Sequence, residues 1–124
     1  MSHPRIRIDV RTEYLDRQSR PAEDVYAFAY TVTIHNDGDQ PAQLVSRHWI
    51  ITDAEGRVQE VRGAGVVGEQ PLIRPGESFE YSSGAVIATP VGSMRGAYHM
   101  VDAAGLRFEA PIAPFTLARP GVLH

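Results

Sequence analysis

A two-residue alternation of apolar and polar side chains runs through this chain and constrains its fold more than any other feature. Along Ile6–Tyr14, large or apolar side chains occupy every second position, and the same period recurs along Tyr26–Ile34 and Phe79–Ile87. Successive side chains of a β-strand point to opposite faces, so this period predicts half-buried strands. No stretch carries a convincing amphipathic helical pattern, and we therefore expect an all-β protein.

Turn residues separate the alternating stretches about every ten residues. Asn36–Asp39 contains residue types that tolerate a positive φ and is expected to close a hairpin. Asp53–Gly56 is expected to reverse the chain with a left-handed glycine at its end. The strand at Arg57–Arg62 should then return antiparallel to the strand at Leu44–Thr52, which lies inside the sheet assembly because both of its faces carry apolar residues.

Further strands are predicted at Met94–Val101 and Leu106–Ala110, and Pro111 and Pro114 are expected to end regular pairing. The total of seven to eight short strands favours an antiparallel β-sandwich of the immunoglobulin or fibronectin type III kind, with a barrel as the competing architecture. Periodicity alone does not choose between the two. Trp49 is expected to be the main core anchor, joined by the aromatic side chains of Phe28, Tyr30, Phe79, Tyr81 and Phe108.

Composition narrows the functional classes. A chain of 124 residues with 43 % hydrophobic content fits a single domain spanning 1–124. It contains no cysteine, so disulfides and thiolate chemistry are excluded. No apolar run approaches the roughly 18 residues that span a bilayer, so we expect no membrane insertion and a cytoplasmic location. The net charge is −3 and the 12 basic residues are dispersed arginines, which argues against nucleic acid as a partner.

The stretch Gly63–Gly68 has the spelling GxGxxG, and its glycines are the principal candidate site. A dinucleotide fingerprint needs a helix after the glycines, but Pro71 and Pro75 prevent one of useful length. Two interpretations stay open. The amides of Gly63, Gly65, Val66, Val67 and Gly68 would form an anion nest assisted by Arg62 or Arg47, or the glycines shape the backbone. We favour the second interpretation.

The remaining polar candidates support little chemistry. Arg47 would bind an anionic group or form a structural salt bridge, and we favour the salt bridge. His48 has no second histidine at ligand spacing, and only the fold would bring His35 or His99 near it, so we expect no metal site and no cofactor. Ser46 lies in a strand without a nucleophile elbow. We therefore expect no catalytic residue.

Once these strands are assigned, the chain closely resembles the ApaG family over nearly its whole length and in the family's order. The segments that carry the resemblance are YLDRQS (Tyr14–Ser19), FAYTVTIHN (Phe28–Asn36), LVSRHWIITDAEG (Leu44–Gly56), VRGAGVVGEQPLIRPGESFEYSSG (Val61–Gly84), GSMRGAYHM (Gly92–Met100) and APFTL (Ala113–Leu117). The resemblance implies a fibronectin III-like β-sandwich without a defined enzymatic activity.

The resemblance also implies possible roles. Bacterial members are linked by name and gene neighbourhood to diadenosine tetraphosphate hydrolysis, cobalt resistance and magnesium efflux, and related eukaryotic domains imply protein binding. We therefore expect a non-enzymatic binding module that engages a protein partner or a small anion through the glycine loop and adjacent turns. Such a module predicts exposed apolar residues around Val66 and Val67. The alternative is a nucleotide- or pyrophosphate-binding accessory protein.

Overall fold

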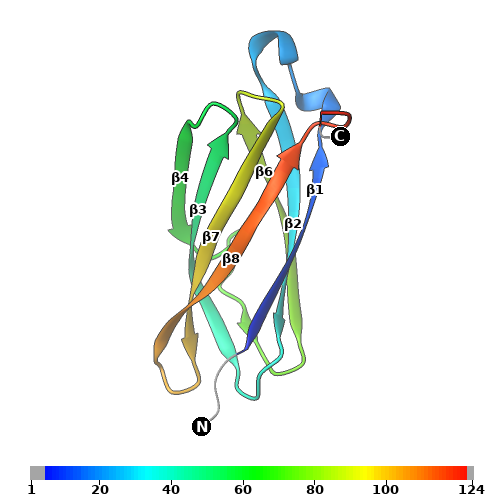
Figure 1. The fold of residues 1–124 in the computed structure, drawn as a ribbon. Helices are drawn as coiled ribbons and strands as arrows, with labels where there is room; N and C mark the ends of the chain where they lie inside the picture. The colour runs from blue at the N-terminus through cyan, green and yellow to red at the C-terminus, as the bar shows by residue number, and fades with distance from the viewer. Residues whose placement is uncertain (1–4, 123–124) are drawn as a thin grey trace.

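The structure, a computed structural model, describes residues 5–122 and consists almost entirely of strands (Figure 1). The elements in chain order are β1 (Ile6–Tyr14), the 3-10 turns η1 (Asp16–Gln18) and η2 (Pro21–Glu23), β2 (Tyr26–Asn36), β3 (Ala42–Asp53), β4 (Val58–Ala64), β5 (Leu72–Ile73), β6 (Ser78–Ile87), β7 (Val91–Asp102) and β8 (Arg107–Ala118). Over residues 5–122, no helical segment has the length and apolar character that crossing a membrane requires.

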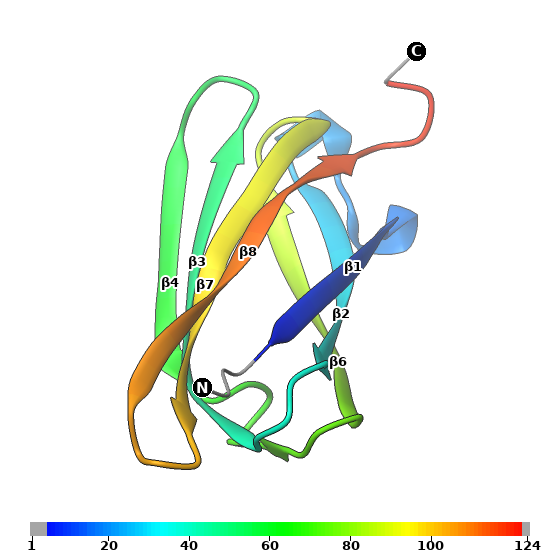
Figure 2. The ribbon, with the colours of Figure 1, turned by 60° about the horizontal axis from the view of Figure 1, so that its bottom comes forward.

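The strands form two antiparallel sheets that pack face to face, which confirms the expected sandwich (Figure 2). The first sheet has the order β1-β2-β6. The second has the order β4-β3-β7-β8, and the short strand β5 also pairs with β3. β3 is thus a central strand of the second sheet, as its two apolar faces predicted, and β4 lies at the edge. The turn between them ends on Gly56 with a φ of 83°, as expected.

The expected hairpin at Asn36–Asp39 is wrong, because β2 and β3 belong to different sheets and the segment crosses between them. Asn36 is fully buried and holds this crossover. Its side-chain amide donates to the carbonyls of Gln40 (2.7 Å) and Ile73 (2.9 Å), and its Oδ1 accepts from the Gly38 amide (3.0 Å). The chain does turn at these residues, but the turn connects the two sheets instead of two paired strands.

The expected end of pairing at Pro111 and Pro114 is also wrong, because β8 continues through both prolines to Ala118. β8 is the last strand of its sheet, so a missing N–H on its outer side breaks no ladder hydrogen bond. The register of the β7–β8 pair also shifts between Met94 and Gly96, which accommodates an irregular stretch. Leu117 lies beyond the prolines and is fully buried.

The core is an aromatic cluster centred on Trp49 in β3, whose side chain is 1 % exposed. The ring centroids of Tyr30, Phe115 and Tyr98 lie 5.3, 5.8 and 6.2 Å from that of Trp49, all in edge-to-face geometry. Among the other residues expected in the core, the structure buries Phe28, Tyr30 and Tyr81, while Phe79 and Phe108 are partly buried and packed against them.

We predict that Trp49→Ala lowers the free energy of unfolding by about 3–5 kcal/mol, because it removes a large buried aromatic that contacts both sheets. Denaturant unfolding measures this loss. Val58→Ala provides the control, since Val58 is 58 % exposed and its truncation should change stability by less than about 0.5 kcal/mol. A loss below about 1 kcal/mol for Trp49→Ala would contradict the assignment of Trp49 as the anchor.

Candidate functional site

The glycine run begins inside β4, where Arg47 of β3 is the cross-strand neighbour of Gly63. The Arg47 guanidinium lies over the backbone at Gly63, and its Nη1 donates to the carbonyls of Ala64 (3.1 Å) and Gly65 (2.9 Å). A Cβ at position 63 would lie 2.8 Å from that Nη1, so the absence of a side chain makes room for the arginine. Within residues 5–122 Arg47 forms no ion pair, so the expected salt bridge is replaced by bonds to carbonyls.

The rest of the run is a tight turn closed by backbone hydrogen bonds. The Gly65 amide donates to the Val45 carbonyl (2.8 Å), and Val66 and Glu69 exchange two hydrogen bonds of 2.8 and 2.9 Å. The two residues between them, Val67 and Gly68, have φ values of 43° and 81°. Two successive positive φ angles are the signature of a type I′ turn. The glycine run is therefore a miniature hairpin with no helix after it.

This geometry leaves few groups for an anion. The amides of Gly65, Val66 and Glu69 already donate to carbonyls. Arg47 and Arg62 lie on opposite faces of the sheet, because Arg62 pairs with His48, the residue next to Arg47. The Arg62 side chain is 72 % exposed and lies 3.9 Å from Glu60. The two arginines therefore do not converge on one ligand.

The two valines of the turn have opposite environments. Val66 is fully buried, which contradicts its expected exposure, and it belongs to the hydrophobic core. Val67 is 56 % exposed at the tip of the turn. A positive φ is rare for a β-branched residue and costs about 1–3 kcal/mol. The turn thus exposes the side chain of Val67, whose backbone is strained, while the buried side chain of Val66 anchors the turn in the core.

The turn at Asp53–Gly56 is closed by side-chain hydrogen bonds, but it lies at the opposite end of β4 from the glycine turn (Figure 1). The Asp53 carboxylate accepts hydrogen bonds from the amides of Glu55 (2.9 Å) and Arg57 (3.0 Å) and from the Arg57 guanidinium (2.6 Å). Burial on its own would raise the pKa of Asp53, but these hydrogen bonds outweigh it and lower the pKa below its usual value. This turn is therefore not part of one site with the glycines.

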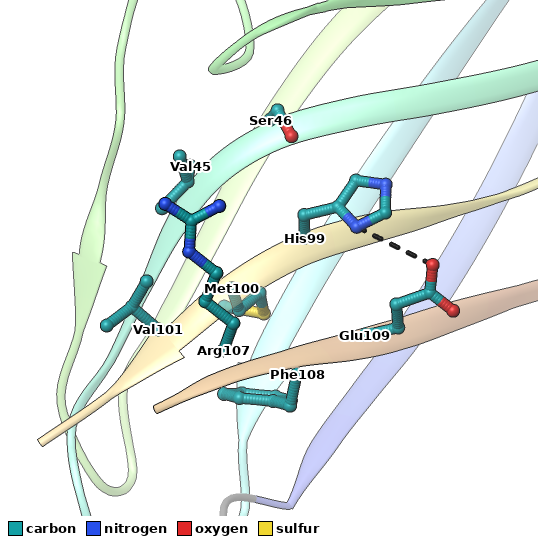
Figure 3. Close-up of a pocket in the computed structure, with 8 residues that line it drawn as sticks. All are labelled: Val45, Ser46, His99, Met100, Val101, Arg107, Phe108 and Glu109. Carbon is teal, nitrogen blue, oxygen red and sulfur yellow. Dashed lines mark ion pairs between the residues drawn. The ribbon is translucent and has the colours of Figure 1, made fainter. Parts of the chain in front are cut away.

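A pocket that sequence reasoning missed lies on the outer side of β3, β7 and β8 (Figure 3). It has a volume of about 260 Å³, and its polar lining includes Ser46, His99, Arg107 and Glu109. Ser46 and Glu109 flank His99 on the two neighbouring strands, and His99 Nδ1 lies 3.5 Å from Glu109 Oε1. No hydrogen bond joins Ser46 to His99 in the described part of the chain. Only the strand register, which the sequence does not show, brings these residues together.

The three histidines considered for a metal site have separate carboxylate neighbours. His35 pairs with Asp9 (2.9 Å), His48 lies 3.9 Å from Glu60, and His99 lies beside Glu109. Within residues 5–122 no group of three histidine or acidic side chains has the geometry to hold a metal ion. The fold therefore does not bring the histidines into one cluster.

We predict that Gly65→Ala destabilises the fold by more than about 1 kcal/mol, because a Cβ there would lie 2.2 Å from the Glu69 carbonyl oxygen in a backbone with a φ of 61°. Gly68→Ala should cost only about 1 kcal/mol, since its Cβ would meet nothing within 4 Å and only the positive φ is penalised. Denaturant unfolding of both variants tests this order. A larger loss for Gly68→Ala would show that the turn has a different geometry.

Comparison with known proteins agrees with this description. Residues 16–102 match the ApaG domain. Protein ApaG of Ralstonia nicotianae is 63 % identical over 124 residues, covering all of both chains, and that of Ectopseudomonas mendocina is 64 % identical over 126 residues, again covering all of both. The crystal structure of a Bordetella pertussis protein described as ApaA superimposes with a TM-score of 0.93 at 57 % identity, covering 95 % of this chain and 96 % of that one. With a full-length sequence match and the same sandwich, this chain belongs to the ApaG family.

Proposed function

We propose that this chain is a non-enzymatic binding module that engages a protein partner through the glycine turn. The observation that carries the proposal is Val67, a β-branched residue held at a φ of 43° with 56 % of its surface exposed. Strained backbone persists where the surrounding structure enforces it and is concentrated at functional sites. Glycine would relieve the strain at position 67, so a valine there is best explained by a contact that its side chain makes.

The surroundings of Val67 support a protein surface as its partner. Leu72 in β5, which follows the turn in sequence, is also exposed, at 49 %. The turn is held on both sides, by Val66 in the core and by Arg47 on the carbonyls of Ala64 and Gly65. A rigid turn with an exposed apolar tip loses little entropy when it binds, which favours association with another protein.

We predict that Val67→Gly leaves stability unchanged or raises it, because glycine adopts a positive φ without strain, and that it weakens partner binding. The measurement uses a photo-reactive residue at position 67 and, as a matched control, at position 86, where valine is 53 % exposed on β6. A saturable protein adduct is expected at position 67 alone. Unlabelled native protein should compete for this adduct, and folded Val67→Gly protein should not.

Equal adduct formation at positions 67 and 86 would contradict the proposal. Equal competition by the native protein and by Val67→Gly would also contradict it, since the side chain of Val67 would then make no difference. Because the competitor variant stays folded, a lost competition reports the contact and not unfolding.

The alternative is a nucleotide- or pyrophosphate-binding accessory protein linked to diadenosine polyphosphate metabolism or to cobalt resistance and magnesium efflux. An anion would use the tip amides of Val67 and Gly68, with Arg62 as the exposed cation nearest in sequence. The three neighbouring amides that already donate to carbonyls weigh against such a nest.

We predict no saturable shift of the amides from Gly65 to Gly68 when pyrophosphate or ATP is added at an ionic strength of about 0.15 M, with or without Mg²⁺ or Co²⁺. Amide chemical-shift titration measures this directly. A saturable, site-specific response that Arg62→Ala weakens would favour the alternative function. It would also show that the tip amides and Arg62 act together in binding.

A further inference from the structure

The strand β4 offers a free backbone edge. Within residues 5–122 it pairs only with β3, and it lies at the outer margin of its sheet in both views (Figures 1 and 2). Its exposed side chains include Val58 and Val61. Natural edge strands are blunted by charged side chains, especially lysine, and by proline, bulges or short length. β4 is seven residues long, pairs with β3 in unbroken register and carries no proline, and its two charged side chains, Glu60 and Arg62, have opposite signs.

The hydrogen bonds to β3 determine which residues of β4 face outward. The Asp53 amide donates to the Arg57 carbonyl (3.0 Å), and the Gly65 amide donates to the Val45 carbonyl (2.8 Å) at the other end of the pair. In an antiparallel ladder such hydrogen-bonded pairs alternate along the strand. The odd-numbered residues of β4 therefore bond to β3. The even-numbered residues Val58, Glu60 and Arg62 direct their N–H and C=O groups away from the sheet.

This arrangement is self-complementary. If a second copy pairs antiparallel about a two-fold axis at Val61, Glu60 of each copy lies directly opposite Arg62 of the other. Both residues face outward, so each such pair is a hydrogen-bonded pair of the new ladder. Opposite charges in directly opposed positions stabilise a strand pair, and like charges destabilise it.

The neighbouring registers are unfavourable. Moving the centre by one residue places Glu60 opposite Glu60, or Arg62 opposite Arg62. A register that opposes even-numbered to odd-numbered residues would match outward groups with groups already bonded to β3. The register centred on Val61 also overlaps the whole of β4, whose bounds Val58 and Ala64 are equidistant from that residue.

We propose that the β4 edge binds a second copy of this chain as a two-fold symmetric, antiparallel strand pair centred on Val61. The two five-stranded sheets then form one continuous sheet across the dimer, through an isologous interface in which each copy contributes the same patch. This surface is distinct from the glycine turn. Arg47 already occupies the Ala64 carbonyl, so pairing ends at that residue and the turn lies beyond it.

Charge reversal tests this register directly. Glu60→Arg gives two arginines that face two arginines in a homodimer, and Arg62→Glu gives the matching repulsion between glutamates. Each variant alone should self-associate at least about tenfold more weakly than the native chain, since two attractive pairs become repulsive. An equal mixture of the two variants should form a heterodimer, because every opposed pair is then again a glutamate and an arginine. Sedimentation velocity over a concentration series measures all three.

Three further variants complete the test. The double variant Glu60→Arg, Arg62→Glu should recover native self-association. Glu13→Arg changes net charge by the same amount as Glu60→Arg, but lies on β1 in the other sheet, and should leave association unchanged. Arg62→Pro removes an outward N–H without breaking a bond to β3 and should give a folded monomer by circular dichroism.

A native chain that stays monomeric up to about 1 mM would overturn the proposal, since that limit corresponds to about 4 kcal/mol of association free energy. A dimer that Glu60→Arg and Arg62→Pro leave intact would also overturn it, because association would then use another surface. Neither result would bear on the glycine turn, whose competition experiment uses Val67→Gly protein with an unaltered β4.

Discussion

The packing of Trp49 between the two sheets is the interaction on which the rest of the structure depends. Without cysteines no disulfide joins the layers, so side-chain packing, together with hydrogen bonds such as that between the Tyr81 and Tyr98 hydroxyls, holds them together. The Trp49 ring meets Tyr30 from the first sheet and Tyr98 and Phe115 from the second, so one side chain joins β2, β3, β7 and β8. Because Trp49 anchors β3, it also positions every strand that pairs with β3, including β4 and β5.

The same strand explains why the glycine turn has the form it does. Arg47 precedes Trp49 by two residues, so both side chains point to one face of β3. The Arg47 side chain extends past Gly63 and donates to the carbonyls of Ala64 and Gly65. A second contact from β3 is the Val45 carbonyl, which accepts a hydrogen bond from the Gly65 amide. The backbone of the turn is thus largely satisfied from β3. These contacts do not use the side chain of Val67, the tip amides of Val67 and Gly68 or the outer edge of β4.

Local pattern predicted most of the fold but little of the site. The alternation at Ile6–Tyr14 and Phe79–Ile87 reports burial of one face, which is a local property, and β1 and β6 cover those residues. The prediction at Asn36 was wrong because turn residues look the same in sequence whether they close a hairpin or connect two sheets. The prediction at Pro111 was wrong because a proline that would end a central strand is tolerated on an edge strand. The glycine spelling indicated a segment in which glycines shape the backbone, but the partners of its amides, Val45 and Glu69, and the burial of Val66 are set by tertiary contacts.

The β4 edge is a second feature that the local sequence pattern could not predict. Glu60 and Arg62 are two residues apart. The sequence alone does not show whether the backbone groups of these two residues bond to the neighbouring strand or face outward, so the spacing by itself predicts no contact. The hydrogen bonds at Asp53 and Gly65 fix which residues face outward, and only then does the pair become complementary to its own two-fold image. Edge charges usually prevent association by repelling a like strand. When opposite charges flank the midpoint of a strand symmetrically, the same two side chains instead select a single register, and the edge distinguishes one partner, its own copy, from strands of other sequence.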